Sequence, residues 1–199
     1  STPFPDGLKA ISADNVTSIR EIANWVLPQI NTLTVTPDGK LGFLATTVGI
    51  VVFDLESNQI VGQFNSVLRP HVSLSLTTTG NRFAVLTHTN VEVWDFANGI
   101  IFNVPIHARG DDLVYSNVQI SPDGKTLAVQ DCEDPSNCWS SQTIDLYDVE
   151  SGQKLDEKPD FGYVYGFDFS PDGSWFVSWN EFGTIWRTEN WTKVRGDIK

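Results

Sequence analysis

The sequence predicts an all-β fold in which one four-stranded unit is repeated four times. A Pro-Asp-Gly turn or a variant of it recurs roughly every 41 to 49 residues, with its glycines at Gly39, Gly80, Gly124 and Gly173. Apolar residues alternate with polar ones on both sides of each turn, as in strands with one buried face. An aromatic residue followed by aspartate comes after the first three turns, as Phe53-Asp54, Trp94-Asp95 and Tyr147-Asp148.

The first strand of each unit leads into the turn. Its apolar positions are Leu33 and Val35, Leu74 and Leu76, Val118 and Ile120, and Phe167 and Phe169. Proline fixes φ at the start of the turn, and glycine takes its left-handed position, so the segment favours a hairpin.

Three further strands complete each unit. The second strands are predicted at 41–45, 82–86, 126–130 and 175–179. The third strands end at the aromatic-Asp pair, whose last version is Ile185-Trp186-Arg187-Thr188. The fourth strands are more polar and are predicted at 60–64, 100–104, 153–157 and 192–195.

These turns, Ser121-Pro-Asp-Gly124 and Ser170-Pro-Asp-Gly173 above all, together with the aromatic-Asp pairs, resemble the WD40-like β-propeller family in its bacterial type. The resemblance covers roughly residues 11 to 195 and implies one blade per unit. The blades are expected at about 26–64, 70–106, 113–158 and 162–196, within a segment 16–199 that follows a lead-in at 1–15. Two features depart from the family pattern: no blade has the Gly-His dipeptide, and Arg187 replaces the aspartate after Trp186.

Residues 19–23 are predicted to form an additional outer strand, although residues 16–23 also fit a short amphipathic helix. With that strand, the chain has five outer strands, although its four units each contribute only one set of three inner strands. An open arc of four blades would expose two sheet faces rich in Phe, Trp and Val. We therefore expect the chain to be part of a larger ring, or of one completed by another chain. The candidate assembly edges are Ile19, Ile22, Trp191 and Val194.

Composition narrows the possible partners. Only 13 basic residues and a formal charge of −12 disfavour nucleic-acid binding. No run of about 18 apolar residues is present, so membrane insertion by a helix is not expected. The absence of methionine and the polar opening suggest a processed or trimmed N-terminus, and the two cysteines with abundant Asn, Thr, Ser and Trp favour an extracellular or cell-envelope location. A protein partner, with another copy as one candidate, is predicted.

Two apparent ligand motifs are better explained by turn chemistry. Gly124-Lys125-Thr126 resembles the end of a phosphate-binding loop, but Gln119 stands where that loop needs glycine. Asp168 to Gly173 resembles the start of a calcium loop, but Trp179 occupies the position of its bidentate Glu. No nucleophile or zinc-protease motif is present. We expect no catalytic residue, no metal and no cofactor.

Cys132 and Cys138 enclose five residues in the loop between the second and third strands of the third unit. A disulfide that holds the local shape of this loop is predicted, since an oxidising compartment permits it.

The loops at one end of the units are predicted to form the interaction face. Its candidate residues are Arg69, His71, His88, His107, Arg109, Asp111, Asp112, Glu133, Asp134, Asp160 and Tyr163. The predicted function is a non-enzymatic interaction or structural module. Two alternatives stay open: an enzyme or sensor domain whose central pocket forms only in the complete ring, and a calcium- or small-ligand-binding propeller that uses the acidic loops.

Overall fold

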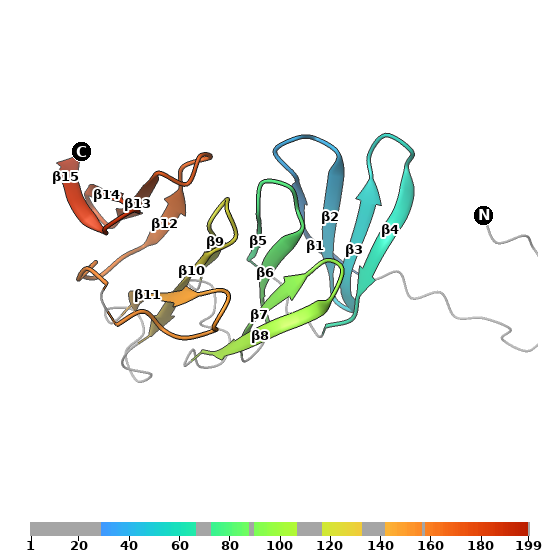
Figure 1. Cartoon of the computed structure of the whole chain (residues 1–199), viewed down its shortest axis with the longest axis horizontal. Helices are drawn as coiled ribbons and strands as arrows, with labels where there is room; N and C mark the ends of the chain where they lie inside the picture. Colours follow the sequence, from blue (N-terminus) through green and yellow to red (C-terminus); the bar gives the residue numbers. More distant parts are fainter. Residues whose placement is uncertain are drawn as a thin grey trace, which may run out of the picture.

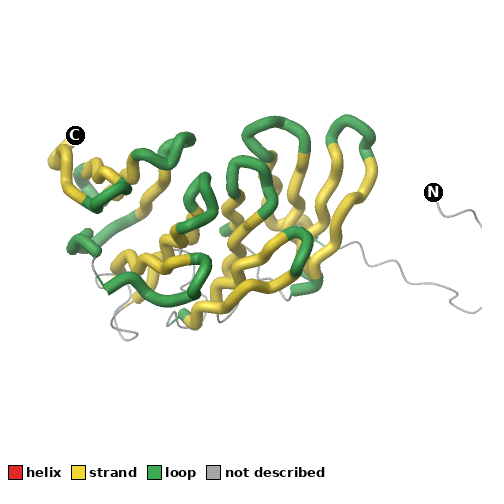
Figure 2. Tube along the Cα trace, in the orientation of Figure 1, coloured by secondary structure: helices red, strands yellow, loops and turns green. Residues whose placement is uncertain are grey.

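A computed structural model describes residues 29–66, 73–87, 90–106, 117–132, 142–156 and 158–198. These residues form strands, turns and loops and contain no helix, so the predicted all-β class is confirmed (Figure 2). The predicted outer strand at 19–23 lies outside the described residues.

Three of the sheets have four antiparallel strands in sequential order. We call the four sheets blades one to four, in chain order. Blade one contains β1 (Ile30–Val35), β2 (Leu41–Thr46), β3 (Gly49–Asp54) and β4 (Gln59–Phe64). Blade two contains β5 (Leu74–Leu76), β6 (Arg82–Leu86), β7 (Asn90–Asp95) and β8 (Gly99–Pro105). Blade four contains β12 (Gly166–Phe169), β13 (Trp175–Trp179), β14 (Gly183–Arg187) and β15 (Thr192–Ile198).

Blade three has three regular strands, β9 (Val118–Ile120), β10 (Thr126–Cys132) and β11 (Gln142–Asp148). At its outer edge, where the sequence predicts a strand at 153–157, the described residues form an isolated bridge between Tyr147 and Lys154. The N–H of Leu155 still donates to the carbonyl of Leu146 at 2.8 Å. The fourth position of this blade is therefore held by a short extended segment.

The blades follow one another side by side, from blade one in blue to blade four in red (Figure 1). Their first strands, β1, β5, β9 and β12, are neighbours in that order. Consecutive blades face each other through alternate side chains of their central strands, as in the sector of a ring.

A separate hydrophobic cluster fills each junction. Between blades one and two, Phe43 and Val52 pack against Phe83, Val85 and Trp94, and the Phe43 and Phe83 rings lie 5.4 Å apart edge to face. The second junction buries the other faces of blades two and three. The third is the most aromatic. Blades two and three are thus covered on both faces, whereas the described residues cover blades one and four on one face each.

The repeated turn has the predicted chemistry. Thr36 Oγ1 donates to Asp38 Oδ1 at 2.6 Å, and the N–H of Lys40 donates to the same oxygen at 3.1 Å. These hydrogen bonds keep the pKa of Asp38 below its ordinary value. The turn around Gly124 has the same arrangement, with Ser121 and Asp123 in these roles. It therefore links two strands and does not open a phosphate-binding helix.

Candidate functional site

The outward face of blade one is apolar and uncovered by the described residues. Leu33 is paired with Leu44, and Val35 with Gly42, so these side chains lie on the face opposite the buried Phe43. Leu33 is 61% exposed and Val35 47%. Leu55, which is 47% exposed, lies over Gly42, because a Cβ there would be 3.1 Å from its Cδ2. We call this surface, extended by Val51 and Phe53, the leading face.

Equivalent positions in the later blades show what such a face contacts. The residues corresponding to Leu33 in blades three and four are Val118 and Phe167, which are 0% and 1% exposed. The residue corresponding to Leu55 in blade three is Val149, which is also 0% exposed. Each is buried against the preceding blade. The leading face therefore has the residues of a blade junction with one side uncovered.

The outward face of blade four is the counterpart at the other end of the arc. In β13, Phe176 and Ser178 are buried toward blade three, so Trp175, Val177 and Trp179 point to the opposite side. Trp179 is 40% exposed. We call this surface, with Ile185, Arg187 and Asp168 of the neighbouring strands, the trailing face.

The trailing face carries charge as well as aromatic surface. The guanidinium of Arg187 lies over the Trp175 ring, 5.4 Å from its centroid. A cavity of about 410 Å³ opens beside this pair and is also lined by Ser174, Thr188 and Glu189. Partial burial raises the pKa of Asp168. Within the described part of the chain, this carboxylate forms no ion pair.

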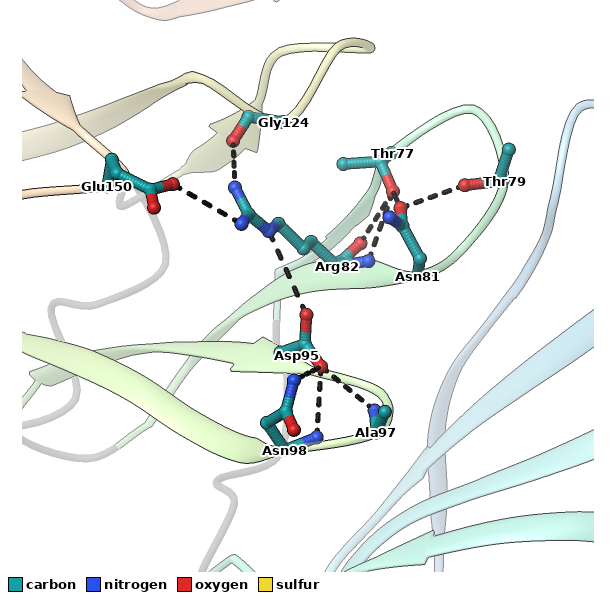
Figure 3. A network of polar contacts seen from close by, with 9 residues as sticks. All are labelled: Thr77, Thr79, Asn81, Arg82, Asp95, Ala97, Asn98, Gly124 and Glu150. Atoms are coloured by element: carbon teal, nitrogen blue, oxygen red, sulfur yellow. Dashed lines mark hydrogen bonds and ion pairs between the residues drawn. The ribbon is translucent and has the colours of Figure 1, made fainter.

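A covered junction shows how polar groups join two blades. Arg82 of blade two donates to the carbonyl of Gly124 at 3.2 Å and lies 3.4 Å from Glu150, both in blade three (Figure 3). Its Nε is 3.9 Å from Asp95 of its own blade. Asp95 also caps the next turn by accepting the N–H of Asn98 at 2.9 Å. This network links the turn ends of blades two and three.

Hydrogen bonds also connect the first strands of neighbouring blades. Ser75 Oγ accepts the N–H of Ile120 at 2.9 Å and donates to Gln119 Oε1 at 2.9 Å. Asn117 Nδ2 donates to the carbonyl of Phe167 at 3.3 Å. Junctions in this protein therefore combine apolar faces with polar contacts at the turn end and along the first strands.

The predicted interaction-face residues are mostly outside the described residues. Those outside are Arg69, His71, His88, His107, Arg109, Asp111, Asp112, Glu133 and Asp134. Asp160 caps a turn by accepting the N–H of Gly162 at 2.9 Å. Tyr163 lies edge to face with Tyr165, 5.2 Å between ring centroids. Asp160 and Tyr163 both lie in the loop that precedes β12.

Three exposed aromatic residues near that loop were not predicted as site residues. Tyr165 is 51% exposed, Trp179 40% and Phe182 36%. The sequence held a signal for Trp179, because the corresponding residues of the other blades are Ala45, Leu86 and Gln130, none of them aromatic.

The predicted assembly edges have different environments. Ile19 and Ile22 lie outside the described residues. Trp191 packs inside the third junction, with its ring 5.4 Å from Phe176, whereas Val194 is 51% exposed on β15. Exposed apolar side chains are thus found on the outward sheet faces, such as Leu33 and Trp179, and also on outer strands, such as Ile60 and Val194.

Cys132 ends β10 and is 5% exposed, paired with Gln142 across the ladder. Cys138 lies outside the described residues, so the disulfide stays a prediction. Among the residues that the structure describes, no group of three His, Cys, Asp or Glu side chains could hold a metal ion. The acidic loop residues Asp111, Asp112, Glu133 and Asp134, which a calcium site would use, lie outside the described residues.

Antiparallel sheets arranged face to face, with their first strands adjacent, define a β-propeller segment. The β-propeller domain of Cps50 (Swd1) from Myceliophteria thermophila is similar, with a TM-score of 0.65 and 13% identity over 89% of this chain and 58% of that one. The hydrazine synthase of Kuenenia stuttgartiensis is similar with a TM-score of 0.60 and 20% identity, over 90% of this chain and 51% of that one. At these identities the likeness shows the fold alone.

The chain therefore spans about half the length of these solved structures. No protein-family model matches the sequence, and no curated protein matches it. Within the described residues, no helix is long and apolar enough to cross a membrane.

Proposed function

We propose that the chain is part of a larger WD40-like β-propeller of the bacterial type and serves as a non-enzymatic interaction and structural module. Further blades cover its leading and trailing faces, and the completed ring presents loops to a protein partner. The observation that carries this proposal is the contrast between exposed Leu33 and the fully buried residues at the same position in blades three and four. The proposal is also supported by length, since this chain covers only 51% and 58% of the two similar solved structures.

Covering the leading face would add apolar burial to the free energy of folding or association. Fully burying a Leu or Val side chain stabilises by about 1.5–3 kcal/mol. Leu33, Val35 and Leu55 retain roughly half of their exposed surface. Covering them would contribute on the order of 1 kcal/mol each, before the contributions of Trp175, Trp179 and the polar groups of the trailing face.

Two of the aspartates that follow the aromatic residues of the third strands have a structural use in this protein. Hydrogen bonds from turn N–H and hydroxyl groups lower the pKa of Asp54 and Asp148, which follow the aromatic residues of their blades. These aspartates stabilise turns. An enzyme would require a different set of groups to perform proton transfer near neutral pH.

Photo-crosslinking tests the proposed role of the leading face. A photoreactive phenylalanine analogue replaces Leu33 in the full chain, produced in cells that naturally make the protein, and adducts are identified by mass spectrometry. The control carries the analogue at Val48, which is 64% exposed in the turn between β2 and β3, away from this face. We expect adducts with blade-like strand segments at position 33 and none at 48. No protein adduct at position 33 would contradict the proposal.

We further propose a location in the cell envelope or outside the cell, with Cys132 and Cys138 joined in a disulfide. A disulfide across a loop of this length is compatible with an oxidising compartment. Cell fractionation and mass spectrometry without reductant test both points. Recovery in the cytosol with two free thiols would overturn them.

A further inference from the structure

We propose that a second copy of this chain supplies the missing blades, with the trailing face of each copy docked on the leading face of the other. This inference rests on the proposed function, because it specifies which blades cover the two faces. Two heterologous contacts of the same kind would close an eight-blade ring, and rings of about 4 to 8 blades are found in propellers.

The first argument is the apolar surface that both faces present at the turn end of the junction. The trailing face presents the large Trp175 at the start of β13. On the leading face, the second-strand position near the turn end is Gly42, where the other blades have Phe83, Leu127 and Phe176. The side chain of Leu55 covers Gly42, with its Cδ2 3.1 Å from where a Cβ would lie. The leading face therefore presents an exposed aliphatic side chain at this place, on which Trp175 would pack.

The second argument is charge complementarity, which follows from the network around Arg82. Glu150, the partner of Arg82 in the next blade, corresponds to Glu56 of blade one. Asp95, the carboxylate beside Arg82, corresponds to Arg187 of blade four. Blade four thus carries Arg187 at its turn end, beside Asp172 and Glu189, and blade one carries Glu56 at the matching place. Arg187 and Glu56 are both exposed in the single chain.

The cavity beside Arg187 is where Glu56 of the second copy would bind. At the covered junction, the turn that bears Glu150 lies against Arg82. The corresponding turn of blade one bears Leu55 and Glu56. The cavity of about 410 Å³ next to Arg187 and Trp175 lies at the equivalent end of the trailing face. Docking would bring Glu56 to Arg187 and bury Leu55, as Val149 is buried at the covered junction.

The third argument is length. The chain covers 51% and 58% of the two similar solved structures, so two copies supply about as much chain as either of them. This amount of chain fits a ring that is built from two copies of the given residues.

Charge exchange tests the inference in solution. Sedimentation velocity of the wild-type chain over a range of concentrations should show a dimer of twice the 22.1 kDa chain mass. Glu56→Arg and Arg187→Glu should each raise the dimer dissociation constant at least ten-fold, because each places like charges in both contacts. The double variant E56R/R187E restores opposite charges and should restore the dimer. Lys125→Glu, at a side chain of blade three that is 79% exposed, should have no effect.

A wild-type chain that stays monomeric to its solubility limit would overturn the second copy as the occupant. So would a double variant that dimerises no better than the single variants, with circular dichroism showing that all of them are folded. The photo-crosslinks at position 33 separate the two proposals. Adducts with a different blade-containing protein would retain the proposed function and reject this inference, whereas the lack of any adduct would reject both.

Discussion

At the scale of single residues, Gly80 shows how closely neighbouring blades approach. It lies in the turn between β5 and β6 with φ +70°, and a Cβ built on it would be 2.7 Å from Thr36 Cγ2 and 3.1 Å from Phe43 Cε2, both in blade one. Gly39 has nearly the same conformation, φ +71°, but no atom lies within 4 Å of its Cβ position. Substitutions at these two glycines therefore distinguish the cost of backbone strain from the cost of contact across the junction.

Gly39→Ala should lower the free energy of unfolding by about 1–2 kcal/mol, since alanine is strained in the left-handed region. Gly80→Ala should cost at least about 1 kcal/mol more, because the added methyl group overpacks the junction between blades one and two. Urea denaturation of both variants measures the difference. Equal losses would mean that this junction adjusts to the methyl group without cost.

Individual residues also show the limits of sequence reasoning about the site. The turns, the aromatic-Asp pairs and the alternation in β1 and β13 predicted two exposed sheet faces, and the exposures of Leu33 and Trp179 bear this out. The choice of Trp191 as an edge residue followed from its position before the last strand. Its ring instead packs between blades three and four, because φ +52° at this residue ends a turn and the side chain meets Phe161 and Phe176.

At the scale of elements, the outer edge of blade three is held by an ion-paired group rather than by a full strand. Asp145 of β11 has a side chain only 9% exposed, and it interacts with the ammonium groups of Lys154 and Lys158. Lys158 also donates to the carbonyl of Ile144 at 2.6 Å. Hydrophobic alternation cannot predict such an edge, since its stability comes from charges that are distant in sequence. This is why residues 153–157 were expected to form a regular strand.

Lys158→Met should lower the free energy of unfolding by about 1–3 kcal/mol at neutral pH, because a buried carboxylate loses one of its two cationic partners. Burial raises the pKa of Asp145, but the hydrogen bonds and charges of Lys154 and Lys158 outweigh it, so the pKa is lowered from 3.8. A lowered pKa in the folded state gives stability that is complete above 3.8 and is lost as the pH falls below it. The cost of the substitution should therefore shrink on acidification below that value.

Chemical denaturation at neutral pH and in acid, for the wild type and the variant, measures this dependence. Lys125→Met is the matched control, because Lys125 is 79% exposed and lies 3.7 Å from the exposed Asp123. A pair of this kind contributes little, so we expect a change within about 0.5 kcal/mol. A Lys158→Met cost that is the same in acid and at neutral pH would show that Asp145 does not depend on this ammonium group.

At the scale of the whole molecule, stability should be unequal along the arc. Local opening requires less free energy where fewer apolar contacts are lost. Strand β6 of blade two is covered on both sides, whereas the equivalent strand β2 of blade one is covered only by blade two. In the single chain, we expect the amides of β6 and β10 to exchange with solvent at least ten-fold more slowly than those of β2 and β13.

Hydrogen exchange followed by mass spectrometry checks this order, and it also reports on the open faces. If further blades cover these faces, assembly should increase protection in β2 and β13, whose side chains would then be buried on both sides, and leave β6 and β10 unchanged. The comparison uses the wild type above and below its association range, with Arg187→Glu as the non-associating reference. Equal protection of β2 and β6 in the dissociated chain would contradict the unequal stability. Protection that rises equally in all four strands would instead mean that assembly stabilises the arc globally, without covering its two ends.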